Sequence, residues 1–193
     1  HINLNSIKVN NKIFYLIIFV VLFATVKFHL RFNIDRKFLD LENVDKSKAI
    51  NVNKINKNFN NLKWISKYAN PKNELIVIEQ ALGVINRDDR KKTLITHYQF
   101  IATILDKPLY ILNRWYLWDN NTHPTENHKY FKFYKSLVNK NIKKNNIEVI
   151  YLLGQKNMIK FDNVKNYFTD VCFESKTLIQ DKFSSHKIIK CKK

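Results

Sequence analysis

The distribution of apolar residues separates a short N-terminal segment from a polar remainder. Residues 13–26 (IFYLIIFVVLFATV) contain fourteen consecutive positions without a charge, a glycine or a proline. If Lys27 and His29 extend toward the interface, the apolar stretch reaches Leu30. Its length then approaches the roughly 20 residues that a helix needs to cross a bilayer. We therefore predict a transmembrane segment within residues 1–30, with its core at residues 13–30.

Two other interpretations of this apolar stretch remain open. A secretory signal peptide also places basic residues such as Lys8 and Lys12 before an apolar run, although no A-x-A-like cleavage site follows here. A buried core helix has a similar composition. An amphipathic surface helix is disfavoured, because the run is apolar on all sides. Basic residues are more frequent just after the run than before it, and by the positive-inside rule alone this would place the C-terminal part in the cytoplasm.

The rest of the chain divides into a linker and a folded domain. Residues 31–61 are charged and rich in asparagine, and we interpret them as a polar linker with one short helix around residues 38–44. The part at 51–61 (NVNKINKNFNN) has too few apolar residues to predict a core element. From residue 62 onward, short apolar runs alternate with longer periodic segments. This pattern predicts a soluble α/β domain over residues 62–193.

The predicted elements alternate along this domain. Strands are predicted at residues 62–65, 93–96, 109–112, 147–153 and 188–189, and helices at residues 74–85, 98–105, 126–145 and 162–168. We expect Asn73 to cap the first helix. Such alternation is typical of βαβ units, and the near-continuous apolar run IEVIYLL at 147–153 fits a strand covered on both faces. The predicted fold is α/β: one N-terminal transmembrane helix followed by a small three-layer, mainly parallel Rossmann-like domain.

The composition adds a large basic excess but no nucleic-acid signature. The chain contains 34 Lys and Arg against 16 Asp and Glu, which gives a formal net charge of +18. Only five of the basic residues are arginine, the residue favoured for bidentate contacts with phosphates and bases. The charges also form no single stripe. We therefore do not expect nucleic-acid binding, and we expect membrane lipid, through its anionic headgroups, to attract the basic residues near the apolar segment.

Two strand ends carry our candidate ligand-binding residues, because ligands of open α/β sheets bind at the carboxyl ends of strands. His97, Tyr98 and Gln99 follow the strand predicted at 93–96 and can meet a ligand at a helix N-terminus. In the alternative interpretation, Tyr98 belongs to the core and His97 is a cap. The second set, which follows residues 109–112, consists of Arg114, Trp115, Tyr116 and Trp118. An arginine among aromatic rings suits stacking on sugars or docking on a partner, although these rings can also simply cover the sheet.

Other reactive side chains give weaker signals. A disulfide between Cys172 and Cys191, the only cysteines, would link the C-terminal strand to the domain and require an oxidising compartment, whereas two buried thiols are the alternative. The two histidines and the glutamate within residues 123–128 match no standard zinc spacing. Asp88 and Asp89 lie among basic residues and are interpreted as a solvated turn. Since no nucleotide-binding loop, nucleophile elbow or zinc-protease motif is present, we assign no catalytic residue, metal or cofactor.

Several of these segments resemble the C-terminal region of bacterial polytopic membrane proteins related to dolichyl-phosphate-mannose-protein mannosyltransferase-like glycosyltransferases. The resemblance is carried by residues 62–65 (LKWI), 94–100 (LITHYQF), 113–116 (NRWY), 147–151 (IEVIY) and the two cysteines. It implies a last helix in the inner membrane that leads into an extracytoplasmic domain. It also implies a catalytic acid in an early loop that is not among these residues. Such tails usually have Asp where this chain has His97, so the resemblance assigns no role to that position.

The resemblance further implies that the domain assists the binding of a glycan, a lipid-linked sugar or an acceptor. The chain begins with His1 and its only methionine is Met158, which fits the tail of a longer polypeptide. The main alternative is a single-span, membrane-anchored domain that binds a protein partner and has no enzymatic activity. A free-standing Rossmann-like enzyme is disfavoured because the chain lacks a nucleotide loop.

Overall fold

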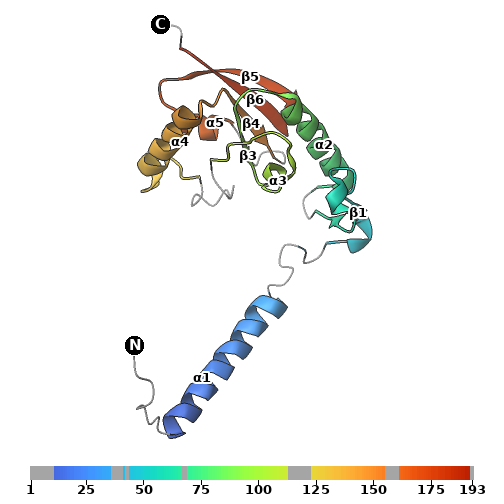
Figure 1. Ribbon diagram of the computed structural model, residues 1–193, viewed down its shortest axis with the longest axis vertical. Helices are drawn as coiled ribbons and strands as arrows, with labels where there is room; N and C mark the ends of the chain where they lie inside the picture. Colours follow the sequence, from blue (N-terminus) through green and yellow to red (C-terminus); the bar gives the residue numbers. More distant parts are fainter. Residues whose placement is uncertain are drawn as a thin grey trace. The chain divides into compact units, whose positions relative to one another are not determined.

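The computed structural model describes residues 11–35, 41, 44–66, 69–112, 123–154 and 161–191 (Figure 1). The chain divides into two compact units, His1–Lys46 and Ser47–Lys193. The first unit contains the apolar helix, and the second contains the α/β domain.

The N-terminal unit is built on a single long apolar helix. Helix α1 spans Asn11–His29 and continues into a π-helical segment, Leu30–Asp35. The stretch Asn11–Asn33 is long and apolar enough to cross a membrane. No side chain of α1 is buried, which does not match a core helix. By length and composition, α1 therefore suits a membrane anchor or a signal sequence.

The C-terminal unit contains a mixed four-stranded sheet in the order β3-β4-β6-β5. Its strands are β3 (Lys92–Thr96), β4 (Val149–Leu153), β5 (Cys172–Ile179) and β6 (Phe183–Ile189). β3 and β4 run parallel, whereas β6 pairs antiparallel with both β4 and β5. The α/β class is thus confirmed, but the expectation of a mainly parallel sheet is wrong. β5 and β6 form a hairpin, and the middle half of β5, residues 174–177, is exposed and polar, so it gave no apolar run in the sequence.

Helices cover both faces of this sheet, with α2 (Pro71–Arg87) on one side and α4 (Phe131–Asn145) on the other (Figure 1). One core contains Leu75, Ile78, Ala81 and Ile85 of α2 with Leu94, Val149, Tyr151 and Leu153 of the sheet. The other contains Val138 and Ile142 of α4 with Ile95, Ile150 and Leu152. Successive strand residues point to opposite faces, so β4 is buried at every position. The domain therefore has three layers, as the apolar run at 147–153 indicated.

Helix boundaries differ from the expected ones where a cap was misassigned. Asn70, not Asn73, caps α2: its side chain accepts hydrogen bonds from the backbone N–H groups of Lys72 and Asn73. Pro71 then occupies the first turn, where its missing N–H costs nothing. α4 begins at Phe131 rather than at residue 126.

Three predicted elements are reduced or absent. The predicted helix at 98–105 shortens to α3 (Ile101–Ile104). The one at 162–168 becomes α5 (Phe161–Val164) and a 3-10 turn, Lys165–Tyr167. Residues 109–112 are irregular rather than a strand, and their backbone meets the sheet where Tyr110 N donates to the Lys92 carbonyl at 3.0 Å. That prediction rested on apolar content alone. The apolar side chains of this segment do pack on the core, but its backbone does not form a strand of the sheet.

Part of the predicted linker is folded into the domain. β1 (Ile50–Asn51) pairs antiparallel with β2 (Lys63–Trp64). Val52 is only 3% exposed, and the apolar side chains of Ile55 and Phe59 pack against the core beside α2. The interpretation of residues 51–61 as linker is therefore wrong, since its few apolar residues recur every three or four positions and all face inward. The short helix expected around residues 38–44 lies largely outside the described residues.

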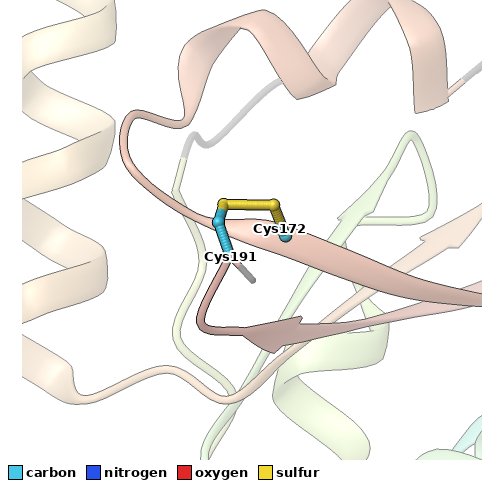
Figure 2. The surroundings of a disulfide bond; sticks show 2 residues. All are labelled: Cys172 and Cys191. Atoms are coloured by element: carbon cyan, nitrogen blue, oxygen red, sulfur yellow. A yellow bond between two sulfur atoms is a disulfide. The ribbon is translucent and has the colours of Figure 1, made fainter. Parts of the chain in front are cut away.

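A disulfide closes the open end of the β5–β6 hairpin. Cys172 and Cys191 are bonded, with their Cα atoms 5.0 Å apart (Figure 2). Cys172 is the first residue of β5 and lies opposite Ile189, the last residue of β6. The sequence left free thiols as an alternative, whereas the pairing register brings these two sulfur atoms together.

Candidate functional site

The carboxyl end of β3 turns sharply into the first candidate segment. β3 ends at Thr96, whose hydroxyl accepts a 3.1 Å hydrogen bond from the backbone N–H of Tyr98. The side-chain amide of Gln99 donates to the carbonyl of Thr96, and its backbone N–H donates to the carbonyl of His97 at 3.0 Å. The turn therefore holds His97, Tyr98 and Gln99 together at the edge of the sheet where ligands of α/β folds bind.

The side chain of Tyr98 belongs to the buried core. It is 6% exposed, and its hydroxyl donates to the carboxylate of Glu74, which is also 6% exposed. The other carboxylate oxygen of Glu74 accepts a 2.8 Å hydrogen bond from Trp64 Nε1. A buried carboxylate is stable only when donors satisfy its oxygens, and these two do so. For Tyr98, the structure therefore agrees with the alternative that the sequence left open.

An aromatic cluster surrounds this carboxylate. The Phe100 ring makes edge contacts with those of Trp64 and Phe59, at centroid distances of 5.7 and 6.1 Å. Trp64 and Tyr98 lie 6.0 Å apart. The sequence did not select Glu74 or Trp64 as site residues. The burial of Glu74 cannot be read from its local sequence, where it resembles any acidic residue near a helix N-terminus.

His97 is the candidate that remains available to a ligand. It is half-buried, and its ring centroid lies 3.9 Å from that of Tyr98. Burial lowers the pKa of His97 below 6.5, although the negative charge of Glu74 opposes this shift. The imidazole is therefore neutral at pH 7, with one donor and one acceptor nitrogen. No described residue forms a hydrogen bond with this ring, and His97 does not cap a helix, because α3 begins only at Ile101.

The second candidate set lies outside the described residues. Arg114, Trp115, Tyr116 and Trp118 all fall within residues 113–122. The candidate site is therefore described without these four residues.

A groove on the α2 side of the sheet was not anticipated from the sequence. It has a volume of about 580 Å³ and is lined by the end of α2, the end of α3 and residues 55–56. Asn86 Nδ2 donates to Asp106 Oδ2 at 3.1 Å, and within the described structure Asn86 Oδ1 is buried without a hydrogen-bond partner. Gly83 keeps one wall open, since a Cβ there would meet only Arg87 Nη2, at 3.9 Å. An amide, a guanidinium and a carboxylate beside aliphatic carbons suit a ligand rich in hydroxyl groups.

The neighbouring carboxylates of Asp88 and Asp89 differ in burial and in their partners. Asp89 is highly exposed and pairs with Lys107, as a turn residue does. The Asp88 side chain is only 11% exposed and accepts hydrogen bonds from Arg90 and from the Tyr151 hydroxyl, the latter at 2.6 Å. Burial alone would raise the pKa of Asp88, but the hydrogen bonds from Arg90 and Tyr151 outweigh it and lower the pKa to about 2. The interpretation as a solvated turn is therefore wrong for Asp88, which links α2 to the centre of the sheet.

The two histidines of residues 123–128 contact different parts of the chain. His123 packs against the rings of Tyr134 and Tyr167, and burial lowers its pKa to about 4. His128 Nδ1 instead faces the backbone N–H of Tyr130, at 3.3 Å. In the described part of the chain, no group of three His, Cys, Asp or Glu side chains is placed to hold a metal ion.

Comparison with known proteins identifies no family for this chain: no family model, no curated protein and no solved structure matches it. The candidate site is therefore defined by the geometry of this chain alone. It comprises two separate regions: the His97–Gln99 turn at the end of β3, and the groove at the C-terminal end of α2, which these three residues do not line.

Proposed function

We propose that this chain is a membrane-anchored α/β domain of a glycosyltransferase-like protein and assists the binding of a glycan, a lipid-linked sugar or an acceptor. Helix α1 supports the membrane anchoring, because its apolar side chains are all exposed and it is long enough to cross a bilayer. Exposing so many large apolar side chains to water is unfavourable, and burial in lipid removes that cost. In this proposal α1 stays attached to the mature domain.

The proposed location is the extracytoplasmic side of a bacterial inner membrane. The Cys172–Cys191 disulfide supports this side, because disulfides persist in oxidising compartments and are rare in the cytosol. Lys27 and Arg31, near the C-terminal end of the apolar stretch, favour the opposite orientation by the positive-inside rule. We give the disulfide more weight, because charge near one helix is a bias, whereas the reducing cytosol breaks such bonds.

The proposed glycan-binding role is supported by polar groups that can donate hydrogen bonds to hydroxyls and accept hydrogen bonds from them. Neutral His97 offers a donor and an acceptor nitrogen at the end of β3. The groove adds the buried amide oxygen of Asn86, with Arg87 and Asp106 beside it. Sugar hydroxyls both donate and accept hydrogen bonds, so they match this mixture. Arg114 and Trp115 remain proposed contacts from the sequence alone.

The test is a glycan-binding measurement on the full chain in nanodiscs. A panel of bacterial glycans and polyprenyl-linked sugars is titrated against the intact protein and against H97A, N86A and G83L variants. Each variant removes a proposed contact or fills the groove, so we expect about tenfold weaker binding. Q80A, on the exposed surface of α2, is the matched control and should bind as the intact chain does. Unchanged affinity in all three variants would reject this site.

The anchoring is tested separately by extracting membranes with carbonate at high pH. An integral α1 keeps the full chain in the membrane pellet, whereas a cleaved signal sequence releases a shorter chain into the supernatant. The alternative function, an anchored protein-interaction domain without enzymatic activity, predicts pelleting of the full chain and no binding to any glycan of the panel. The two measurements therefore distinguish the proposal from its alternative.

A further inference from the structure

The outward side of α4 combines exposed apolar residues with lysines. Val138 and Ile142 face the core. On the opposite side of the helix, Phe133 is 72% exposed and Leu137 is 39% exposed, one turn apart. Residues three or four positions apart share a side of a helix, so this surface also includes Ser136, Lys140 and Lys144. We call Phe133, Ser136, Leu137, Lys140 and Lys144 the α4 outer face.

This helix is also strongly and one-sidedly charged. α4 contains five lysines and no acidic residue. Among the described residues, none of these lysines forms an ion pair with a carboxylate, so no described carboxylate neutralises their charge. α2, on the other side of the sheet, carries two basic and two acidic residues and has no net charge. α4 therefore carries an unbalanced positive charge, whereas α2 does not.

We propose that the α4 outer face docks on an anionic lipid bilayer. Phe133 and Leu137 enter the boundary between headgroups and acyl chains, and Lys140 and Lys144 contact lipid phosphates. The inference rests on the proposed anchoring by α1, which holds the domain near a bilayer and raises its effective concentration there. Tyr130 extends the same surface: it is 55% exposed, and Lys129 Nζ lies 4.8 Å from its ring centroid.

A lipid surface fits these side chains better than the other polyanions do. Arginine is the side chain best suited to nucleic-acid and phosphate recognition, and α4 has no arginine. Lysine is a strongly hydrated point charge without a fixed hydrogen-bonding geometry, which suits a fluid layer of headgroups. Exposed Phe133 and Leu137 gain little from a phosphate backbone but gain from contact with acyl chains. Docking through α4 turns the α2 side, with its groove, away from the lipid.

The test uses the full chain, held by α1 in nanodiscs of phosphatidylcholine alone or of phosphatidylcholine mixed with phosphatidylglycerol. The native cysteines are bonded to each other, so a cysteine introduced by S136C is the single site for a polarity-sensitive fluorophore. We expect blue-shifted, brighter emission only in the anionic nanodiscs. The matched control is Q80C on the exposed surface of α2, whose fluorophore should report water in both lipids.

Variants of the α4 outer face then test its two components. Loss of each lysine in K140Q and K144Q should lower the docking equilibrium constant about fivefold, and added salt should weaken docking further. F133S should reduce the blue shift without disturbing the fold, because Phe133 is exposed. Emission at position 136 that does not depend on the lipid, or that responds to an added oligonucleotide without anionic lipid, would overturn the inference. Failure of anchoring is recognised separately, because the chain is then absent from the nanodisc fraction.

Discussion

Trp64 Nε1 donates a 2.8 Å hydrogen bond to the carboxylate of Glu74. This bond joins β2 to the first turn of α2 and fixes residues 50–64 onto the domain. It also supplies a donor to a buried carboxylate, whose other oxygen accepts from the Tyr98 hydroxyl. The two donors allow a negative charge to lie among aromatic rings at the end of β3.

The W64F variant tests this relationship. The substitution keeps an aromatic ring but removes the donor, so a buried carboxylate oxygen loses its hydrogen bond. We expect the free energy of unfolding to fall by about 1–3 kcal/mol, as measured by urea denaturation. L62A is the control, because Leu62 is 55% exposed and should change stability little. If W64F changed stability as little as L62A does, the hydrogen bond from Trp64 to Glu74 would make no contribution to stability.

The disulfide should stabilise the domain by restricting its unfolded chain. It closes a loop with a sequence separation of 19. In the loop-entropy model, the double variant C172S/C191S should lose about 3 kcal/mol of unfolding free energy. Urea denaturation of the intact and double-variant chains measures this loss. A difference below 1 kcal/mol would mean that the hairpin is equally constrained without the bond.

His186 should make the domain sensitive to mild acid. Its ring is 4% exposed, lies between the hydroxyls of Ser175 and Ser184 at 2.8 and 2.9 Å, and stacks on Phe161 with centroids 3.6 Å apart. Burial lowers the pKa of His186 from 6.5 to about 4. Between these values the unfolded chain binds a proton that the folded chain does not. Stability is therefore complete above pH 6.5 and falls as the pH drops toward 4.

The H186Q variant isolates this contribution. Glutamine can still hydrogen-bond the two serine hydroxyls but does not titrate, so the slope of unfolding free energy against pH should become shallower between pH 6.5 and 4. The remaining slope should come from His123, whose pKa is also lowered to about 4, and from His97, whose pKa burial also lowers. Urea denaturation across this pH range measures both slopes. Parallel curves for the two chains would contradict the assignment.

Asp88 should control a second and more acidic transition. Its pKa of about 2 lies below the ordinary value of 3.8, so its stabilising contribution is complete above pH 4 and is lost as the pH falls toward 2. The D88N variant removes the carboxylate that accepts from Arg90 and Tyr151 and should destabilise the domain by about 1–3 kcal/mol at pH 7. Its unfolding free energy should also vary less between pH 4 and pH 2. Neighbouring Asp89 is exposed, so D89N should leave stability nearly unchanged.

The candidate site was only partly readable from the sequence. His97 was selected because it follows an apolar strand, and β3 does end immediately before it. Glu74 and Asp88 resemble ordinary surface carboxylates in sequence, and their burial depends on Trp64, Tyr98 and Tyr151, which are brought to them by the fold. The groove at the end of α2 could not be predicted for the same reason, because its walls come from three segments that are separate in sequence.

The sequence by itself determined the apolar helix and the elements β3, β4, α2 and α4. Each has a local signal: an unbroken apolar run, or apolar residues repeating with the period of a helix. Only the tertiary structure decided that β5 and β6 form an antiparallel hairpin, that Val52 is buried, and that two carboxylates lie inside. The physical reason is that strand direction and burial are set by partners far along the chain, which local periodicity does not encode.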